Sequence, residues 1–341
     1  MVSARIRWGV AGCGWVARDY VIPGIRAVDN AVFAAAQDPD HAALAPLSDA
    51  ATYHALDDML ARDDIDAVYI AAPNHLHAPI ALACARARKA VLCEKPIAHD
   101  LAGARAICAA FTEAGVPFAT AYDQRFHAAH RMIRAMIARG DLGLVTQARV
   151  HYACWVGPQW AADNWRVDAS RSGGGALIDL APHCVDLLDW LIGAQLDELH
   201  VMLQRRAQNY AVDDGAVIAA RWSNGALATI NVGYNCPETL PRRRLEIIGT
   251  QGMACAQDTM GQTPGGSLAF IDAATGDTRM LDLVDDRSPF AVQIEAFSHA
   301  LLTREPFPFT ADRDLALFTI LMNAAHAAER RADREIAFAS A

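Results

Sequence analysis

The amino-acid sequence predicts an α/β protein: a Rossmann domain with a parallel, doubly wound sheet, then an α+β C-terminal domain with a large, open-faced antiparallel sheet. Short apolar strands alternate with helical stretches over the first 120 residues, which indicates right-handed crossovers between parallel strands. A glycine-rich turn follows the first strand directly. After about residue 145 strands predominate, and Asn224-Gly225 between two of them is a strong hairpin signal.

The first half begins directly with a strand, and each later strand is closed by a polar or proline-containing turn. Because the apolar runs are three to six residues long and the stretches between them have helical character, we expect one strand–helix repeat after another. The strands are predicted at 6–11, 32–36, 67–72 and 91–93, with helices ending near residue 27 and spanning 79–88.

The second half is expected to form an antiparallel sheet with helices on one face. The other face then meets water, substrate or another subunit, and the apolar stretch 226–230 on it predicts a homodimer or homotetramer formed by sheet stacking. The strands are predicted at 145–154, 215–222, 226–234 and 244–249 and near residues 268 and 281, and the helices within 172–192, 290–302 and 312–332.

Composition excludes several classes of protein. The chain has 341 residues, 53% of them hydrophobic, which is enough for two folded domains. Its formal net charge is −9 and its longest basic run is Arg242–Arg244, so no nucleic-acid partner is expected. No signal peptide and no membrane-length apolar stretch is recognised, and the eight cysteines are scattered without a C-x-x-C pair. We therefore expect a cytoplasmic protein with reduced thiols.

The glycine-rich turn has the spacing of a dinucleotide-binding motif. In G-x-G-x-x-A the first glycine permits the tight turn, the second lets the backbone approach a pyrophosphate, and the small last residue lets helix and strand pack closely. Asp38 lies at the end of the second strand, where a carboxylate accepts from a ribose 2′-hydroxyl and disfavours a 2′-phosphate. We therefore expect NAD as cofactor, with NADP possible. The turn comprises Gly12, Cys13, Gly14, Trp15, Val16 and Ala17.

Lys95 stands out because the chain uses arginine for almost every positive charge. Of 30 basic residues, only Lys89 and Lys95 are lysines. Arginine does not lose its proton at any useful pH, whereas lysine does when its surroundings lower its pKa. Lys95 follows an apolar strand, and ligands of open α/β sheets bind at the carboxyl ends of such strands. It is therefore a candidate catalytic residue.

Asp179 and His183 are four residues apart in the helix that follows three glycines, so they share one face of it. A carboxylate one turn away can hold an imidazole in one tautomer with a pKa near neutral, which suits a general acid/base acting on a hydroxyl. Asp186 falls on the same face. No further histidine or cysteine stands at ligand spacing, so no metal site is expected.

Several motifs together resemble the Gfo/Idh/MocA oxidoreductases, which include glucose-fructose oxidoreductase, inositol dehydrogenase and 1,5-anhydrofructose reductase. The resemblance runs in order along nearly the whole chain, and Asn164-Trp165-Arg166 resembles the branch that contains 1,5-anhydrofructose reductase. The motifs are the turn at 12–17, Pro73-Asn74-His75-Leu76-His77, Glu94-Lys95-Pro96 and the segment 173–183, Gly-Gly-Gly-Ala-Leu-Ile-Asp-Leu-Ala-Pro-His.

The resemblance implies hydride transfer between a nicotinamide and a carbon of a sugar, anhydro-sugar or cyclitol. It implies a dinucleotide-binding domain over 1–123 and a substrate-binding and oligomerisation domain over 124–341. It places Lys95, Asp179 and His183 around the nicotinamide ring: Lys95 and His183 are acid/base and alkoxide stabiliser, either being the proximal acid/base, and Asp179 orients them. The residues expected at the cofactor are Gly12, Cys13, Gly14, Trp15, Val16, Asp38, Ala72, Asn74, His77, Glu94, Lys95, Gln124, Trp165 and Arg166.

The chain also departs from its relatives. The branch with 1,5-anhydrofructose reductase favours NADPH, whereas Asp38 favours NAD. Many relatives have a tyrosine near the start of the penultimate helix, where this chain has Ser288-Pro289-Phe290. We expect His127 and His130 to lie on an exposed helix face and His75 to be structural or solvated.

Two alternative functions remain open. One is a non-catalytic dinucleotide sensor on the same scaffold, for which a damaged lysine or histidine is expected; Lys95, Asp179 and His183 are all present. The other is oxidation or reduction of a non-sugar such as a tetrapyrrole or dihydrodiol, although such relatives often lack the full Asp-x-x-x-His.

Overall fold

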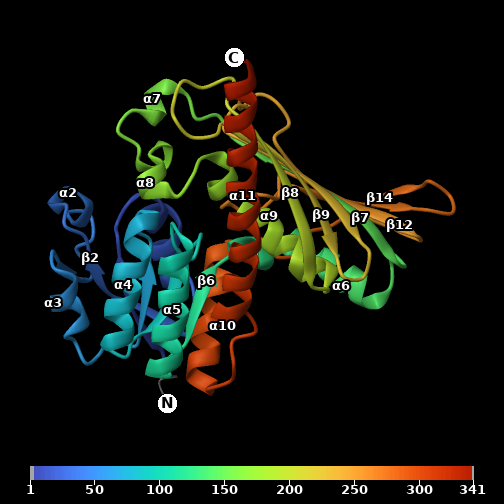
Figure 1. Cartoon of the computed structure of the whole chain (residues 1–341). Helices are drawn as coiled ribbons and strands as arrows, with labels where there is room; N and C mark the ends of the chain where they lie inside the picture. The colour runs from blue at the N-terminus through green and yellow to red at the C-terminus, as the bar shows by residue number, and fades with distance from the viewer. Residues whose placement is uncertain (1–3, 340–341) are drawn as a thin grey trace. The chain divides into compact units, whose positions relative to one another are not determined.

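The computed structural model describes residues 4–339, and it divides them into two compact units (Figure 1). The first unit contains residues 4–123 together with Arg287–Ala316, and the second contains Gln124–Asp286 together with residues 317–339. The predicted domains 1–123 and 124–341 differ from these units in the segment 287–316, which packs with the first unit. The functional division into a dinucleotide-binding and a substrate-binding domain stays a prediction.

The first unit is built on a parallel sheet, as predicted. Within the described residues it has six strands in the order β3-β2-β1-β4-β5-β6, and every neighbouring pair is parallel. This order reverses between β1 and β4, which is where ligands bind in a doubly wound sheet. The strands are β1 (Ile6–Ala11), β2 (Ala31–Gln37), β3 (Ala51–Tyr53), β4 (Ala67–Ile70), β5 (Ala90–Glu94) and β6 (Phe118–Ala121).

Helices cover both faces of this sheet. On one face α10 packs against α1, β1 and β2, with Phe290, Ile294 and Phe297 in the same buried cluster as Trp8. On the other face α4 packs against α3, α5, β4 and β5. The helices are the π-helical turn η1 (Ala17–Val21), α1 (Ile22–Arg26), α2 (His41–Leu44), α3 (Leu56–Leu60), α4 (Asn74–Arg86), α5 (Leu101–Ala114) and α10 (Pro289–Thr303).

The helix α4 begins earlier than the predicted start at residue 79. The prediction placed Pro79 at the helix start, where a proline is tolerated because its missing N–H has no partner there. In the structure Pro79 lies inside α4, which begins at Asn74. Asn74 and His77 therefore lie in the first turns of a helix at the carboxyl end of β4.

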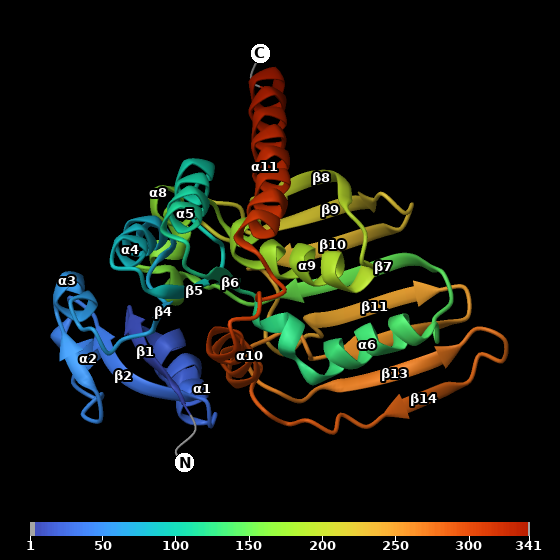
Figure 2. The same ribbon diagram turned by 90° about the horizontal axis from the view of Figure 1, so that it is seen from below.

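The second unit is built on a mostly antiparallel sheet, which Figure 2 shows with its strands side by side. Its eight strands within the described residues run in the order β14-β13-β12-β11-β7-β10-β9-β8. The central pair β7–β10 is parallel, unlike the antiparallel pairing that was predicted throughout. The strands are β7 (Val145–Ala153), β8 (Leu196–Gln204), β9 (Gly215–Trp222), β10 (Leu227–Gly233), β11 (Arg243–Gly249), β12 (Gly252–Gln257), β13 (Ser267–Asp272) and β14 (Thr278–Leu281).

One face of this sheet is covered by helices, as Figure 2 shows for α6 and α9. Alternate residues of β9 are buried against that face, and those between them are exposed. The fold class is therefore the predicted one. The remaining elements are η2 (Asp123–Phe126), α6 (Ala128–Arg139), α7 (Pro158–Ala161), η3 (Trp165–Val167), α8 (Ala169–Ser172), α9 (Ala176–Ile192) and α11 (Ala311–Ala339).

The prediction that His127 and His130 are exposed is wrong. Both side chains are buried, and the imidazole of His130 lies between the Gln124 carbonyl oxygen, 2.7 Å from Nδ1, and the Thr259 hydroxyl, 3.0 Å from Nε2. A neutral ring satisfies both contacts, because Nδ1–H donates to the carbonyl and Nε2 accepts from the hydroxyl. Burial lowers the pKa of His130 to about 3.

Stability of the second unit is expected to fall as the pH drops below 6.5. Between pH 6.5 and the lowered pKa of about 3, His130 takes up a proton in the unfolded chain and not in the folded one. The loss at pH 5 is about 2 kcal/mol for this group. Urea unfolding at pH 7 and pH 5 measures it. We expect a smaller pH-dependent loss in His130→Gln and an unchanged one in His299→Gln, whose side chain is exposed; equal losses in wild type and His130→Gln would contradict the assignment.

Candidate functional site

The glycine-rich turn between β1 and η1 has room for a ligand beside its backbone. Gly12 has φ +87°, and a Cβ atom there would lie 2.6 Å from the Ala72 backbone nitrogen, so only glycine fits. A Cβ atom on Gly14 would meet no atom within 4 Å. Ala17 is fully buried beneath the turn. The open backbone at Gly14 fits the approach of a pyrophosphate, as the motif predicts.

Asp38 holds this turn from the end of β2. The Cys13 backbone N–H donates to Asp38 Oδ2 at 2.7 Å, and the Asp40 N–H donates to Oδ1 at 2.9 Å. The side chain is half-buried. Each carboxylate oxygen keeps a second lone pair, so Asp38 both fixes the turn and can accept from a ribose hydroxyl beside it. Burial next to Asp38 raises the pKa of the Cys13 thiol to about 12, so this cysteine stays protonated.

The loop after β4 brings Ala72, Asn74 and His77 together. Ala72 contacts the Gly12 turn, and Asn74 is buried. His77 is fully buried, with Nδ1 2.8 Å from the Pro96 carbonyl oxygen and Nε2 2.9 Å from the Ala72 carbonyl oxygen. His77 was predicted to lie at the cofactor, whereas its two ring nitrogens face backbone carbonyl oxygens of its own unit.

Glu94 and Lys95 lie at the carboxyl end of β5, next to β4 in the sheet. The Tyr69 hydroxyl donates to Glu94 Oε1 at 2.7 Å. Burial and the Glu94 carboxylate raise the pKa of Tyr69 well above its usual value, so the hydroxyl stays a donor. Lys95 is half-buried, and the Lys95–Pro96 peptide is cis. The Gly12 turn, Asn74 and Lys95 thus share one edge of the parallel sheet.

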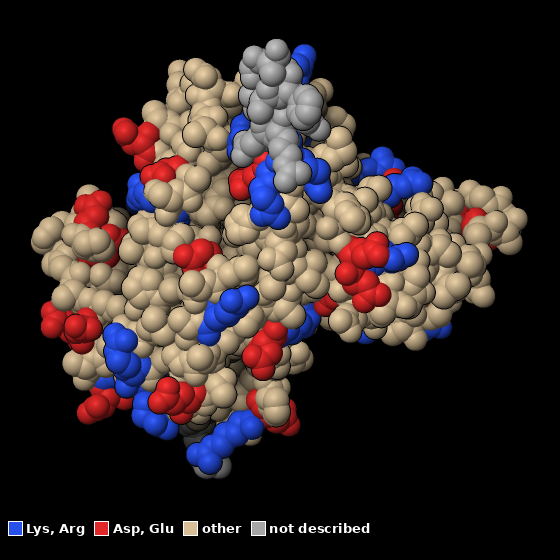
Figure 3. All heavy atoms as spheres, in the orientation of Figure 1, with Lys and Arg blue, Asp and Glu red and all other residues tan. Residues whose placement is uncertain are grey.

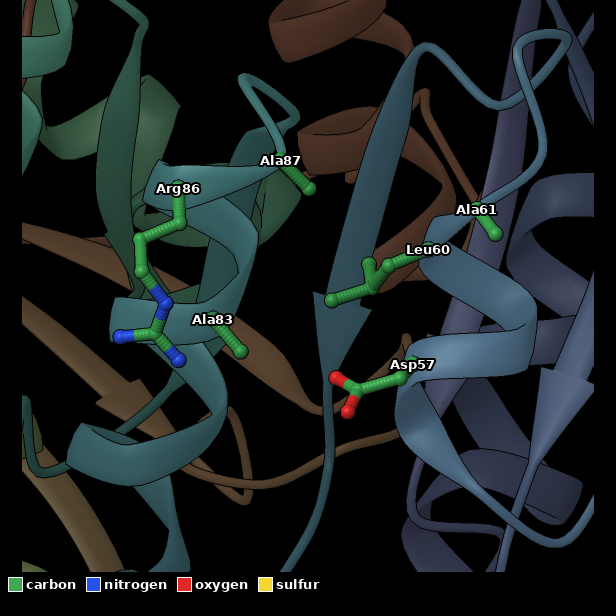
Figure 4. A pocket seen from close by; sticks show the side chains of 6 residues that line it. All are labelled: Asp57, Leu60, Ala61, Ala83, Arg86 and Ala87. Carbon is green, nitrogen blue, oxygen red and sulfur yellow. The ribbon is translucent and has the colours of Figure 1, made fainter.

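A hollow in the first unit lies away from these residues. Figure 4 shows it between α3 and the last turns of α4. The motif residues Asn74 and His77 occupy the opposite end of α4. The hollow therefore plays no part in the predicted cofactor site. It is lined by Asp57, Leu60, Ala61, Ala83, Arg86 and Ala87.

In the second unit the need for a glycine at the start of α9 is explained by Asp213, which was not predicted as a site residue. The Gly175 and Leu177 backbone N–H groups donate to the two carboxylate oxygens of Asp213 at 2.9 and 2.7 Å, which caps the helix. A Cβ atom on Gly175 would lie 2.1 Å from the Asp213 carbonyl oxygen. Burial raises the pKa of Asp213 despite these amides. The cap fixes the start of the helix that carries Asp179 and His183.

Asp179 and His183 project from the first three turns of α9 beside two tyrosines. The Tyr234 hydroxyl donates to Asp179 Oδ2 at 2.8 Å, and the Tyr152 ring meets the His183 ring edge-on at 5.8 Å between centroids. Burial and the Asp179 carboxylate raise the pKa of Tyr234 well above its usual value. His183 is buried and Asp179 half-buried. Neither tyrosine was predicted to belong to the site, because only its contact with Asp179 or His183, far away in the sequence, shows that it does.

Gln124 and its neighbour Arg125 are buried in the second unit. The Gln124 amide donates to the Gly261 carbonyl oxygen at 3.0 Å. The Arg125 guanidinium forms a two-pronged ion pair with Asp186, its Nε donating to Oδ2 at 2.6 Å, and both side chains are 1% exposed. Asp186, which the sequence placed beside Asp179 and His183, is thus the partner of Arg125.

Trp165 and Arg166 lie in the short helix η3, where the Asn164 side chain accepts from the Arg166 backbone N–H at 3.0 Å. The Arg166 guanidinium stacks on Trp165 at 4.4 Å and approaches Trp160 at 5.7 Å from the ring centres. Trp160 is 43% exposed. This cation–π cluster holds the Arg166 charge at the surface of the second unit.

Two other kinds of site are absent from the described residues. No group of three or more His, Cys, Asp or Glu suited to a metal occurs among the described residues. No helix in the described part of the chain is both long and apolar enough to cross a bilayer. On the face seen in Figure 3, acidic and basic side chains alternate across largely uncharged surface.

Fold and site define the class of protein. The first unit has a parallel sheet in the strand order of a dinucleotide-binding fold, with a glycine-rich turn and an acidic residue at its switch point. The second unit has an open mixed sheet. The chain belongs to the GFO/IDH/MocA family. Residues 6–122 match the model described as "Oxidoreductase family, NAD-binding Rossmann fold", and residues 130–255 match the GFO/IDH/MocA C-terminal domain. The protein is thus an oxidoreductase with an NAD-binding Rossmann fold, and the resemblance is confirmed.

The chain is similar to named members of this family. It is 29% identical to 1,5-anhydro-D-fructose reductase of Ensifer adhaerens over 86% of this chain and 88% of the relative. It is 28% identical to trans-1,2-dihydrobenzene-1,2-diol dehydrogenase of Mus musculus over 76% of each. A structure of levoglucosan dehydrogenase in complex with NADH and levoglucosan superposes with a TM-score of 0.84, at 20% identity, covering 96% of this chain and 98% of that one.

Proposed function

We propose that the protein transfers hydride between NAD and a carbon of a sugar, anhydro-sugar or cyclitol. The observation that carries the proposal is the shared edge of the first unit, where the open Gly14 backbone, Asp38 and Lys95 follow β1, β2 and β5. The similarity to 1,5-anhydro-D-fructose reductase supports the substrate class. The nicotinamide supplies the hydride acceptor or donor.

In this proposal Lys95 and His183 serve the same substrate hydroxyl. Oxidation of a CH–OH group releases a proton as the hydride leaves, and one of the two side chains takes it while the other stabilises the negative charge on oxygen. Asp179, held by Tyr234 at 2.8 Å, orients the imidazole one helical turn away. Reduction runs the same steps backwards.

The proposed cofactor contacts follow the motif positions. The backbone of the Gly12 turn meets the pyrophosphate, Asp38 accepts from the adenosine ribose, and residues after β4 and β5 line the nicotinamide side. Arg166, held by two indoles, supplies a positive charge from the second unit. The full set is Gly12, Cys13, Gly14, Trp15, Val16, Asp38, Ala72, Asn74, Glu94, Lys95, Gln124, Trp165 and Arg166; His77 is left out of it because both of its ring nitrogens face backbone carbonyl oxygens.

Initial rates test the proposal. NAD and NADP are each assayed in both directions with 1,5-anhydro-D-fructose, levoglucosan, aldoses and cyclitols, with Lys95→Ala as the blank. A Lys95-dependent rate on one of these substrates supports the function. A rate on trans-dihydrobenzenediol alone would favour the second candidate, suggested by the mouse relative, and tight NADH binding without any rate would favour a sensor.

Replacing Asp38 with alanine is expected to narrow the preference for NAD over NADP by about tenfold, because the carboxylate accepts from the ribose hydroxyl and repels a 2′-phosphate. The ratio of kcat/KM for the two cofactors measures it. Asp40→Ala, which removes the neighbouring helix cap, is the matched control. An unchanged ratio in Asp38→Ala would mean that Asp38 only holds the turn at Cys13.

We also propose that the open sheet face of the second unit joins two copies of the chain. Apolar side chains on this face are exposed, among them Met202 (76%), Val217 (49%) and Leu227 (48%), and Met202 and Val217 are cross-strand neighbours. Stacking would bury them. Light scattering that gives the mass of one chain would contradict this.

A further inference from the structure

We infer that His77 and Tyr69 are positioning residues that hold Lys95 in place by fixing its two neighbours in the chain. All of these residues belong to the first unit. The inference rests on the proposed function, in which Lys95 acts on the substrate, and it adds two residues that touch neither substrate nor cofactor.

His77 lies between the backbone after Lys95 and the loop after β4. Its fully buried ring lies between the Pro96 carbonyl oxygen at 2.8 Å and the Ala72 carbonyl oxygen at 2.9 Å. Burial lowers the pKa of His77 to about 4, so the ring is neutral at pH 7, and its single N–H donates to one of the two carbonyl oxygens while the other ring nitrogen, which carries a lone pair, forms no hydrogen bond with the second. Ala72 in turn contacts the Gly12 turn. The ring therefore fills the space between the Lys95 loop and the loop beside the glycine turn, and it is hydrogen-bonded to one of them.

Tyr69 fixes the residue before Lys95. Its hydroxyl donates to Glu94 Oε1 at 2.7 Å, and its fully buried ring lies 6.5 Å from the ring of Trp8. Trp8 is itself held by a hydrogen bond from Nε1 to Ser298 at 3.0 Å. The Glu94 carboxylate is thus attached to the core of the sheet.

Two anchors on either side of one residue restrict its backbone far more than β5 alone does. Catalytic groups need to stay within about half an ångström of their working position, and a displacement of about 1 Å can lower the rate about a hundredfold. Lys95 has a long, flexible side chain, so a fixed backbone is the part of its position that the protein can control directly.

The two lysines of this chain allow a test that needs no substrate. Reductive methylation with ¹³C-formaldehyde labels both lysines and the N-terminal amine and keeps the lysine charges. Lys95→Arg and Lys89→Arg assign the two side-chain signals. We expect His77→Asn and Tyr69→Phe each to shift the Lys95 signal and leave the Lys89 signal unchanged. His75→Asn, the same substitution in the same helix, is the control and moves neither.

Kinetic measurements give the second readout. They use whichever substrate is active in the initial-rate assays. We expect His77→Asn and Tyr69→Phe to lower kcat by about ten- to a hundredfold with KM and NADH affinity little changed. If they act through Lys95, each combined with Lys95→Ala is no slower than Lys95→Ala alone. Losses that multiply in the double variants would overturn the inference, as would an unmoved Lys95 signal in both single variants.

The inference and the proposed function fail in different ways. Near-normal turnover by Lys95→Ala refutes the catalytic role of Lys95, whatever the labelling shows. If Lys95→Ala is slow but His77→Asn and Tyr69→Phe keep full activity, only the positioning role is refuted. Tyr69→Phe removes one oxygen atom and keeps the ring, so it tests the inference even if His77→Asn does not fold.

Discussion

Replacing Lys95 with alanine is expected to lower kcat by about a hundredfold or more while NADH affinity stays nearly unchanged. The ammonium group is proposed to act on the oxygen that gains charge as the hydride moves, and this contact is far stronger in the transition state than in the bound state. In the proposed function, cofactor binding rests mainly on the backbone of the Gly12 turn and on Asp38. Initial rates with 1,5-anhydro-D-fructose or levoglucosan, together with NADH titration by fluorescence, separate the two effects.

Lys89 is the natural control for this experiment. Its ammonium donates to the Arg62 carbonyl oxygen at 2.8 Å, and it precedes β5, whereas Lys95 follows it. Lys89→Ala should keep full turnover. Lys95→Arg keeps a positive charge that cannot give up a proton. Partial recovery in Lys95→Arg would assign Lys95 to charge stabilisation and His183 to proton transfer, and no recovery would favour Lys95 as the proton donor. Normal kcat in Lys95→Ala would remove it from the mechanism.

Local patterns in the sequence were sufficient for many of the elements and for the glycine-rich turn, although no predicted strand covers β3, β6, β8 or β12. The predicted strands 6–11 and 215–222 have the bounds of β1 and β9, because a buried strand is a short apolar run or a strict alternation that ends at turn residues. Gly12 could be selected because its positive φ leaves only one suitable residue type. Such features depend on neighbouring residues alone.

Long-range partners could not be predicted in the same way. Asp213 caps α9 from outside that helix, and Tyr234 reaches Asp179 from beyond β10. His130 was expected on an exposed helix face, but it is fully buried and contacts Thr259, 129 residues further along the chain. The parallel pair β7–β10 also joins strands far apart in the chain. In each case the position of the residue or strand depends on its pairing with a distant segment, and the sequence of a single segment does not contain that information.

The position of α10 illustrates the same limit. Everything after residue 123 was predicted to form one domain, as the resemblance implies. The chain returns, however, and α10 packs in the core of the first unit beside Trp8, where Phe297 lies 5.8 Å from its ring. An amphipathic or apolar helix can cover any sheet of matching shape, so its pattern does not say which one.

Replacing Asp186 with alanine is expected to destabilise the protein by about 3–5 kcal/mol. The carboxylate is bonded to both Nε and Nη2 of Arg125, and both side chains are 1% exposed. Removing one member of a buried pair leaves the other charge in a region of low dielectric without compensation. Urea unfolding, with the free energy extrapolated to water, measures the loss. A loss below about 1 kcal/mol would mean that Arg125 finds water or another partner.

Two further variants separate burial from pairing. Glu198 forms an ion pair with Arg221 on the exposed sheet face, both side chains being about half exposed, so Glu198→Ala should cost less than about 1 kcal/mol. Arg125→Met combined with Asp186→Leu removes both buried charges and should recover much of the stability that Asp186→Ala loses. Because Asp186 shares α9 with Asp179 and His183, turnover of this double variant also tests whether the buried pair serves only the fold. Full recovery of both stability and kcat would assign it to the fold alone, whereas recovered stability with low kcat would show that Asp186 also sets the geometry of α9.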